Sequence, residues 1–407
     1  MVKLLDISAN THKKILLLQG PVGPFFFNLA HDLRKTGAEV FKINLNGGDL
    51  FFYPWGAKNY YGTLRDWPTF LECYIKEKSI DLILLFGDCR PLHRIAHTIA
   101  GKCDVEVGVF EEGYVRPNYV TLERFGVNGN SQVLKQTREW WSQETREVPD
   151  PMPVLPTFRH AMVWAMLYNL FGTLLTPLFG NYQHHRDLHI FDGICWLRSF
   201  WKKWVYRISE RGIEERLKNE LGGRYFLVPL QVGNDAQIHA HSSFNNNIEF
   251  IETVIKSFAK YASKDLYLVI KQHPLERGYS HNGPLIEKLA ILNGISDRVL
   301  YIHDQHLPSL LTHARGVVVI NSTVGLSAMH HNCPVIAMGE AIYSMPGLTY
   351  QGVLDDFWEN GCPPSRSQYR AFCHRLIHSN QINGNFYRRL PVPEFRSGLM
   401  WRDTRNA

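Results

Sequence analysis

Short apolar runs that end in a polar motif and lead into a helical pattern recur along this chain. The first run, residues 14–19 (KILLLQ), ends at a glycine- and proline-rich turn, and a helical pattern follows from Phe25 to Lys35. Runs of the same kind cover residues 40–45, 81–86, 105–110, 225–230, 267–270, 317–320 and 335–338. Strands that alternate with helices are typical of parallel sheets with helices on both faces. The pattern therefore predicts an α/β, doubly wound fold.

The length of the chain favours two domains, because a single hydrophobic core stops growing at roughly 250 to 300 residues and this chain has 407. We predict an N-terminal Rossmann-like domain at 1–150, a helical insertion at 151–215, and a C-terminal Rossmann-like domain with terminal helices at 216–407. In both halves the strands end in polar residues, where ligands gather in such sheets. The sequence thus predicts two doubly wound domains that face each other across a cleft, in a GT-B-like arrangement.

Charge and cysteine content exclude several classes of protein. The net charge of +6 is a mild excess, which suits an anionic ligand or a membrane surface better than nucleic acid. The seven cysteines form no C-x-x-C pair, which argues against a disulfide framework and against a zinc site. The N-terminus lacks the pattern of a signal peptide. We therefore expect a chain that stays in the cytoplasm.

The middle of the chain differs in character from both halves. Residues 161–180 carry no charge, and a segment rich in Trp, Arg and Lys follows at 184–207. About 20 apolar residues suffice to span a bilayer, but Gly172 and Pro177 interrupt this stretch. We expect a hydrophobic hairpin that lies on the membrane surface, with basic flanks that meet anionic headgroups. A membrane span and a buried core helix are the alternatives.

Two motifs in the second half are suited to a phosphate. Asn321, Ser322 and Thr323 follow a buried strand and open a helix, so their hydroxyls and backbone N–H groups converge where the helix dipole is positive. Simple helix capping by a hydroxyl explains the same pattern equally well. Lys271 and His273 also lie just after a strand, where each can neutralise or bond a nucleotide phosphate.

The remaining donor-side candidates are Pro274 and Gln231. Pro274 fixes the turn that presents Lys271 and His273, although a histidine in such a loop is often only a structural residue. Gln231 ends the first strand of the second half, where the base or sugar of a donor would bind. A polar turn is the equally good alternative for Gln231.

Glu111 and Glu112 follow the strand at 105–110 and are the candidate catalytic carboxylates. Either can act as acid, base or nucleophile, and Arg116 lies close enough in sequence to bind a substrate carboxylate through two hydrogen bonds. The alternative is a solvated charged loop. Gly113 and Pro117 favour a loop of defined shape instead.

Two further turns in the first half are candidates for the acceptor side of the cleft. The turn that contains Gly20 and Gly23 resembles a nucleotide-binding turn but lacks both the G-x-G-x-x-G pattern and the lysine of a P-loop. Asp88 and Arg90 follow the strand at 81–86 and are placed to line the same pocket. A purely structural role is the alternative for both turns.

The sequence predicts no metal site. His93 and His97 have the i, i+4 spacing of zinc ligands, but there is no H-E-x-x-H motif and no nearby third ligand. We interpret them as part of a surface helix. A D-x-D motif is also absent from the chain.

Six motifs in a fixed order carry a resemblance to a known family. They are LLQGPVGPFF (17–26), FGDCRPLH (86–93), FEEGYVRP (110–117), VIKQHP (269–274), INSTVG (320–325) and GLTYQG (347–352). On these motifs the chain resembles the KpsS/LipB capsule polysaccharide proteins across nearly its whole length. That resemblance implies a retaining β-Kdo transferase, which takes Kdo from CMP-Kdo and starts the lipid linker of the capsule on a (lyso)phosphatidylglycerol acceptor. It further implies a site at the inner face of the cytoplasmic membrane and other capsule biosynthesis and export proteins as partners.

The resemblance also implies roles for individual residues. His273 and Pro274 would bind the cytidylate, and Ser322 and Thr323 would bind its phosphate. Related Kdo transferases often carry Glu-Asp-Gly where this chain has Glu-Glu-Gly, which leaves the division of labour between Glu111 and Glu112 open.

Our mechanistic hypothesis assigns three roles in the first half of the chain. Glu112 attacks or stabilises the anomeric centre, Glu111 or a neighbour assists the acceptor hydroxyl, and Arg116 holds the Kdo carboxylate. We expect no metal or other cofactor, because Lys271, His273 and the helix N-terminus can offset a monophosphate leaving group.

Two other classes of function fit the same sequence. One is a non-catalytic component of the capsule export machinery, in which the uncharged stretch at 161–180 would be the working part. The other is a nucleotide-sugar epimerase or hydrolase, which would release free sugar without a lipid acceptor.

Overall fold

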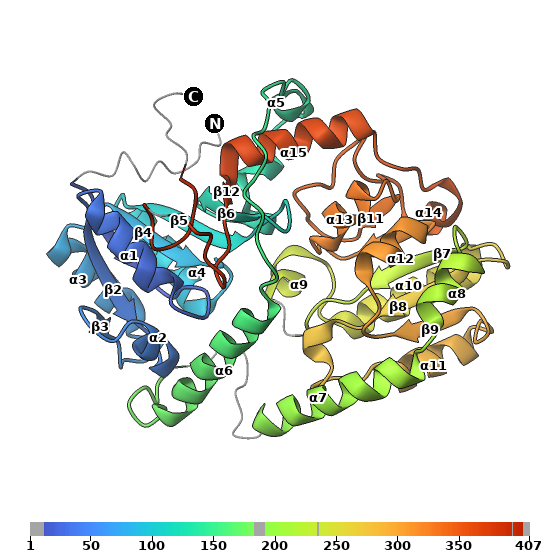
Figure 1. Ribbon diagram of the computed structural model, residues 1–407, viewed down its shortest axis with the longest axis horizontal. Coiled ribbons are helices and arrows are strands. Elements are labelled where there is room, and N and C mark those ends of the chain that lie inside the picture. The colour runs from blue at the N-terminus through green and yellow to red at the C-terminus, as the bar shows by residue number, and fades with distance from the viewer. Residues whose placement is uncertain (1–11, 183–191, 234–235, 393, 402–407) are drawn as a thin grey trace. The chain divides into compact units, whose positions relative to one another are not determined.

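The structure is a computed structural model that describes residues 12–182, 192–233, 236–392 and 394–401. The chain divides into two compact units, each built around its own sheet (Figure 1). Unit 1 comprises Met1–Thr137, Glu144–Leu188 and Cys373–Ala407. Unit 2 comprises Arg138–Gln143 and His189–Phe372.

Unit 1 contains a seven-stranded sheet with the order β12-β6-β5-β4-β1-β2-β3. Its strands are β1 (Lys14–Leu17), β2 (Glu39–Asn44), β3 (Lys58–Asn59), β4 (Leu82–Phe86), β5 (Glu106–Glu112), β6 (Tyr119–Arg124) and β12 (Gln381–Asn383). Strands β1 to β5 are parallel to one another, as predicted. Strand order reverses between β1 and β4, because β2 and β3 continue on one side of β1 whereas β4 and β5 continue on the other.

Helices cover both faces of this sheet. They are α1 (Phe25–Lys35), α2 (Gly47–Phe52), α3 (Trp67–Lys78), α4 (Pro91–Lys102) and α6 (Phe158–Leu174), with 3-10 turns at Asn128–Asn130 and Gln132–Lys135. Strand β1 shows the reason, since Ile15 and Leu17 pack with α1 whereas Leu16 and Leu18 pack with α3 and α4. Alternate residues of a strand point to opposite faces, so a continuous apolar run requires cover on both sides. The doubly wound prediction is confirmed for unit 1.

Two strands at one edge of the sheet escaped the sequence prediction. Strand β6 runs antiparallel to β5, and β12 runs antiparallel to β6. Only residues 113–118 connect β5 to β6, which is too short for a crossover to a parallel strand. The C-terminal segment also packs into the core of unit 1, where the rings of Phe386 and Phe25 lie 4.9 Å apart.

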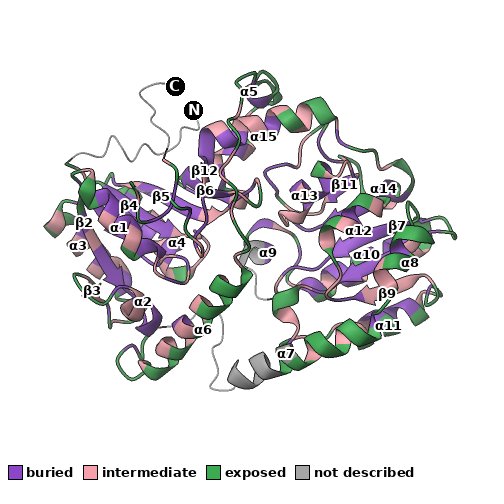
Figure 2. Cartoon of the chain, viewed as in Figure 1, coloured by how far each residue is buried: buried purple, intermediate pink, exposed green. Residues whose placement is uncertain are grey.

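Unit 2 contains a five-stranded sheet with the order β11-β10-β7-β8-β9, all strands parallel. The strands are β7 (Tyr225–Pro229), β8 (Tyr267–Lys271), β9 (Val299–Ile302), β10 (Gly316–Val319) and β11 (Val335–Ala337). The helices are α5 (Arg138–Ser142), α7 (Asp192–Ser209), α8 (Ile213–Asn219), α9 (Ala236–His241), α10 (Asn247–Tyr261), α11 (Gly283–Leu292), α12 (Leu307–His313), α13 (Val324–His330) and α14 (Leu354–Asn360), with a 3-10 turn at Pro274–Glu276. Helix α15 (Arg366–Asn380) begins in unit 2 and continues into unit 1 from Cys373. The central strands β7, β8 and β10 are buried (Figure 2), and strand order reverses between β7 and β10.

The domain boundaries differ from the prediction of 1–150, 151–215 and 216–407. The expected insertion does not form a body of its own, because α6 belongs to unit 1 whereas α7 and α8 belong to unit 2. The C-terminal segment from Cys373 returns to unit 1 rather than ending the second domain. Part of the predicted basic segment at 184–207 lies outside the described residues.

Helix α6 replaces the hairpin that was expected at 161–180. It continues through Gly172, and the turn at Pro177 comes only after its end. The helix packs on α2, where the rings of Phe51 and Phe171 stack 3.8 Å apart. In the part of the chain that the structure describes, none of the helices has the length and apolarity needed to cross a membrane.

Two glycines test how α6 is held. A Cβ at Gly47 would lie 2.3 Å from the carbonyl oxygen of Phe171, whereas a Cβ at Gly172 would meet nothing within 4 Å. Gly47→Ala should lower the free energy of unfolding by about 1 to 3 kcal/mol, because α6 must move away from α2. Gly172→Ala should raise it by up to about 1 kcal/mol, because alanine is the better helix former. Urea unfolding of both variants checks this, and equal effects would contradict the packing.

Candidate functional site

The reversal of strand order in unit 1 brings Gln19 and Arg90 together. Gln19 follows β1 and Arg90 follows β4, and Arg90 Nη1 donates to Gln19 Oε1 at 2.6 Å. The Gln19 amide nitrogen donates to the hydroxyls of Tyr168 at 2.8 Å and Tyr182 at 2.9 Å. Ligands of open α/β sheets bind at such switch points. Arg90, a predicted acceptor-side residue, therefore lies where a ligand of this unit is expected.

Tyr168 from α6 is the centre of a buried hydrogen-bond network. Its hydroxyl accepts from Gln19 and from Asn46 Nδ2 at 2.7 Å, and it donates to Asp49 Oδ1 at 3.0 Å. Burial raises the pKa of Tyr168 well above its usual value, and the nearby Asp49 raises it further. The tyrosine therefore stays protonated, and it ties α6 to the edge of the sheet that carries Gln19.

A small cavity of about 20 Å³ lies beside this network. It is lined by Gln19, Leu45, Tyr60, Gly62, Leu64, Arg90, Pro91, Leu92, His93, Asn181 and Tyr182. The interpretation of His93 as part of a surface helix is wrong, because the residue is fully buried. Its Nδ1 lies 2.6 Å from the carbonyl oxygen of Gly87. Burial lowers the pKa of His93 to about 3, so the ring is neutral and Nδ1 donates to that carbonyl.

Glu111 and Glu112 close the carboxyl end of β5 in two different environments. Burial raises the pKa of Glu111 to about 7, although one of its oxygens accepts from the Glu112 N–H at 3.0 Å. The charges of Glu112 and Asp88 raise it further, and Arg90 opposes them. The Glu112 carboxylate instead accepts a hydrogen bond from the Tyr387 hydroxyl at 2.8 Å. Two adjacent carboxyl groups with different surroundings suit an acid–base role and a nucleophilic role.

The loop after these carboxylates has the defined shape that the sequence predicted. A Cβ at Gly113 would lie 2.0 Å from the carbonyl oxygen of Tyr119, so only glycine allows this close approach. The side chain of Gln381 in β12 accepts from the backbone N–H groups of Tyr114 and Val115 at 2.9 and 3.3 Å. Arg116 is exposed, and its Nε donates to Gly113 O at 3.1 Å.

The other acceptor-side candidates have structural contacts. Asp88 is 2% exposed, and its Oδ2 accepts from the Val127 N–H at 3.0 Å and from Asn130 Nδ2 at 3.1 Å. Gly23 has φ +111, which favours glycine, and a Cβ at Gly20 would lie 2.8 Å from the ring of Phe26. These residues shape the loops that carry Gln19 and Arg90.

Unit 2 places a similar pair at its own reversal of strand order. Gln231 follows β7 and Asn321 follows β10, and Gln231 Nε2 donates to Asn321 Oδ1 at 3.0 Å. Asn247 Nδ2 donates to the Gln231 carbonyl oxygen at 2.8 Å, which fixes the loop. The two donor-side candidates are thus brought together by the sheet.

Ser322 and Thr323 begin the turn into α13. Ser322 Oγ accepts from the Val324 N–H at 3.2 Å, and Tyr343 donates its hydroxyl proton to the Ser322 carbonyl oxygen. The side chain of Thr323 makes no capping bond to the helix. The capping alternative therefore accounts for Ser322, and it leaves the role of Thr323 untested.

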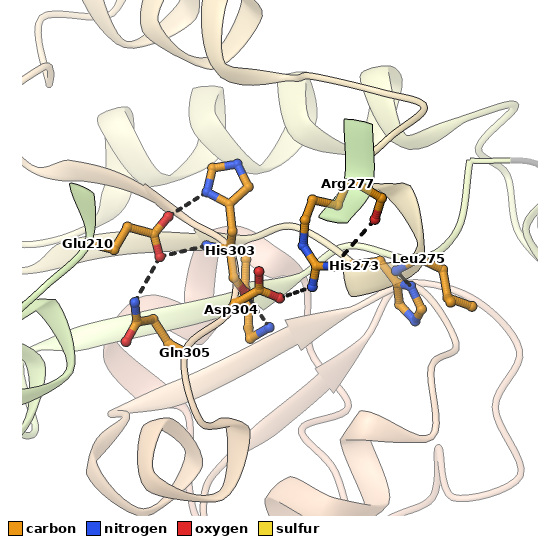
Figure 3. Close-up of polar contacts among 9 residues, drawn as sticks. Glu210, His273, Leu275, Arg277, His303, Asp304 and Gln305 are labelled. Carbon is orange, nitrogen blue, oxygen red and sulfur yellow. Dashed lines mark hydrogen bonds and ion pairs between the residues drawn. The ribbon is translucent and has the colours of Figure 1, made fainter. Parts of the chain in front are cut away.

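The Lys271-Gln272-His273-Pro274 motif divides into buried and accessible parts. Lys271 is buried, its Nζ donates to the His303 carbonyl oxygen at 2.7 Å, and burial lowers its pKa. His273 is half-buried, and its Nδ1 accepts from the Leu275 N–H at 3.2 Å (Figure 3). Pro274 opens the 3-10 turn that follows.

A polar cluster around His303 was not found from the sequence. His303 Nδ1 lies 2.5 Å from Glu210 Oε1, and Gln305 Nε2 donates to the other oxygen of Glu210 at 2.8 Å (Figure 3). Burial opposes the charge of Glu210, but the bonds from His303 and Gln305 lower its pKa overall. Arg277 and Asp304 form an ion pair in the same cluster. Recognition of β9 as a strand would have placed His303 and Asp304 at the carboxyl end of the sheet.

Comparison with known proteins identifies relatives among the capsule polysaccharide proteins. A family model described as "Capsule polysaccharide biosynthesis protein" matches residues 81–387. The chain is 40% identical over 377 residues to the capsule polysaccharide export protein KpsS of Escherichia coli, which covers 92% of this chain and 97% of KpsS. It is 38% identical over 395 residues to the capsule polysaccharide modification protein LipB of Neisseria meningitidis serogroup A, which covers 94% of this chain and 93% of LipB.

One solved structure that matches is KpsC of Thermosulfurimonas dismutans, a beta Kdo 2,7 transferase. The match covers 94% of each chain at 15% identity, with a TM-score of 0.43. In the described part of the chain, no group of three His, Cys, Asp or Glu side chains is placed to hold a metal ion.

The pKa of Glu111 predicts a pH dependence of stability. The usual pKa of a glutamate is 4.5, and that of Glu111 is about 7. Between these values the folded chain keeps a proton that the unfolded chain has lost, so the free energy of unfolding falls as pH rises. Glutamine does not titrate, so Glu111→Gln removes this fall. The difference in free energy of unfolding between the variant and wild type should therefore increase from pH 5 to 7 in favour of the variant, and it should stay constant above pH 7.

Glu144→Gln is the matched control, measured by urea unfolding at each pH. Hydrogen bonds from Arg146 and Arg375 lower the pKa of Glu144 to about 2, so its contribution changes only below the usual glutamate pKa. The stability difference between this variant and wild type should therefore stay constant from pH 5 to 8. A constant difference for Glu111→Gln as well would contradict the proposed environment of Glu111.

Proposed function

This chain belongs to the capsule polysaccharide biosynthesis protein family, and we propose that it is a retaining β-Kdo transferase. The donor in this proposal is CMP-Kdo, and the acceptor is a (lyso)phosphatidylglycerol on which the lipid linker of the capsule begins. The observation that carries the proposal is the pair Glu111 and Glu112 at the carboxyl end of β5, two neighbouring carboxyl groups in unlike environments. The six ordered sequence motifs support the choice of donor and acceptor.

In the first step, a carboxylate oxygen of Glu112 forms a bond to the anomeric carbon of Kdo. The bond from that carbon to the CMP phosphate oxygen breaks, and the leaving oxygen keeps the electron pair. Tyr387 is a positioning residue in this scheme, because its hydroxyl holds the Glu112 carboxylate at 2.8 Å. Arg116 is exposed on the same loop, where its guanidinium can pair with the Kdo carboxylate.

In the second step, the acceptor hydroxyl oxygen attacks the anomeric carbon as the bond to Glu112 breaks. Glu112 keeps the electron pair, and Glu111 takes the proton of the acceptor hydroxyl. A pKa of about 7 suits a group that must accept a proton at neutral pH. Two displacements at one carbon give net retention, as the proposal requires. Gln19 and Arg90 lie at the nearby switch point and would contact the acceptor.

In unit 2 the donor would be bound at the carboxyl edge of the sheet. The candidate donor-binding residues follow three strands of this sheet. Gln231 follows β7, His273 and Pro274 follow β8, and the Asn321-Ser322-Thr323 turn follows β10. Lys271 would act only through its charge, because its ammonium group is buried against His303 O. We propose that the reaction needs no metal, since these groups can offset the charge of a monophosphate.

The same proposal places the protein at the inner face of the cytoplasmic membrane with other capsule proteins. Helix α6 supports a membrane location, because apolar side chains recur on it at every fourth residue and are exposed. These are Phe158, Met162, Met166, Leu170 and Leu174. A spacing of four residues puts them on one face of the helix. A helix face in contact with water is normally polar, whereas this exposed face is apolar.

Glu112→Gln tests the nucleophile. The amide cannot form the covalent intermediate, so transfer should fall by about a thousandfold or more, whereas CMP affinity should be unchanged. Product formation is measured by mass spectrometry with purified protein, CMP-Kdo generated in situ and a fluorescent phosphatidylglycerol analogue. The exposed Glu359→Gln is the control and should retain full transfer. Substantial turnover by Glu112→Gln would refute the assignment.

His273→Asn tests the donor site in the same assay. Asparagine can still accept from the Leu275 N–H, so the turn is preserved while the imidazole is lost. We expect a loss of CMP affinity of about tenfold or more, measured by calorimetry, together with loss of the Kdo mass gain. His330→Ala, an exposed histidine of the same unit, is the control. No mass gain with folded wild-type protein would instead favour a non-catalytic component of the export machinery.

A further inference from the structure

From Arg198 onward, where its side chains are mostly described, helix α7 packs with the polarity of its faces inverted. A helix at the surface of a globular protein normally buries its apolar face. The face of α7 that contacts unit 2 instead carries Ser199, Tyr206 and Glu210 at its end. Tyr206 stacks on His303 with 3.5 Å between ring centres, Glu210 bonds to His303, and Ser199 Oγ accepts from Arg277 at 3.4 Å.

Much of the described part of α7 is exposed (Figure 2), and the residues on its opposite face are large and apolar. Trp201 is 69% exposed, Trp204 53%, Val205 39% and Ile208 73%. The spacing of three and four residues puts these four on one side of a helix with 3.6 residues per turn. We call this set the Trp201–Ile208 stripe. Its exposure follows from the inner contacts, which leave the helix no freedom to turn the stripe inward.

Positive charges lie on both sides of the stripe. By the same helical period, exposed Arg198 neighbours Trp201 and exposed Arg207 neighbours Trp204, each at a spacing of three residues. The sequence contains no acidic residue from 193 to 209. An apolar stripe with tryptophans and flanking arginines matches an anionic lipid surface, where rings enter the headgroup boundary and guanidinium groups meet phosphates.

We propose that α7 docks unit 2 onto an anionic phospholipid surface, with its axis in the plane of the membrane and the Trp201–Ile208 stripe inserted. The proposal rests on the proposed function, in which the acceptor is a lipid, and it names the surface that brings the protein to it. From Trp201 to Ile208 the stripe runs roughly 10 Å along the helix axis, so it reaches more than one lipid. The inner bonds to His303 and Arg277 hold the helix in that orientation.

Vesicle binding by the full chain tests this proposal. Wild-type protein is sedimented with phosphatidylcholine vesicles that contain or lack phosphatidylglycerol, at low and high NaCl. We expect binding that requires phosphatidylglycerol and weakens with salt. Trp201→Ser with Trp204→Ser should lower the partition coefficient about tenfold or more at both salt concentrations, because the apolar contribution is lost. Arg198→Glu with Arg207→Glu should lower it mainly at low salt.

Trp55→Ser is the matched control, because Trp55 is 77% exposed but lies on unit 1, outside the Trp201–Ile208 stripe. It should bind vesicles as wild type does. All variants are first checked by thermal unfolding, which should be unchanged since the replaced side chains are exposed. Equal binding by wild type and the double tryptophan variant would overturn the proposal.

Two further results separate this proposal from the transferase proposal. Transfer to a short-chain acceptor dispersed in detergent is measured in parallel, and the double tryptophan variant should retain it. No vesicle binding by wild type, with transfer intact, would overturn the docking surface alone. Self-association that requires Trp201 and Trp204, without vesicle binding, would assign the stripe to a second copy of the chain and overturn the lipid surface.

Discussion

The hydrogen bond between Arg90 and Gln19 joins the two strands between which the order of the first sheet reverses. Gln19 in turn binds Tyr168, and Tyr168 binds Asn46 and Asp49, so one polar network links the strand ends to α2 and α6. Buried polar groups of this kind must all be satisfied, because an unpaired one is costly. The position of α6, and the apolar face that it exposes, therefore depend on contacts at the candidate site. Gln231 and Asn321 make the corresponding contact in the second sheet.

The two carboxyl groups of the Glu-Glu-Gly motif show how neighbours in sequence acquire different chemistry. Successive residues of a strand point in different directions, so Glu111 and Glu112 have different hydrogen-bond partners although they are adjacent. Glu111 is buried, and its burial raises its pKa. The charges of Glu112 and Asp88 raise that pKa further. Glu112 instead receives the Tyr387 hydroxyl, from the segment that returns to unit 1 at the end of the chain. The C-terminal residues thus complete a site that begins at β5.

Local patterns predicted most of the strands and the polar motifs at their ends, because buried parallel strands are continuous apolar runs. Contacts between distant residues were beyond such patterns. Strand β12 pairs with β6, and Glu210 bonds to His303 across 93 residues. His93 was assigned to the surface because its i, i+4 spacing with His97 gives no sign of the core that covers it. The prediction of a hairpin at 161–180 was wrong for a similar reason. Gly172 was expected to interrupt the helix, but it lies within α6 at a position where a Cβ would meet open space.

The inverted helix α7 has a consequence for unit 2. Exposed tryptophans in water favour aggregation, so a helix that turns its polar face inward is useful only if another surface covers the apolar one. The inner contacts of α7 end on His303, which follows β9, and β9 lies next to β8, whose end carries His273. A surface that binds lipid and the motifs proposed to bind the donor would then share one folded unit. Docking of α7 would fix the distance of the donor motifs from the lipid surface without any further contact.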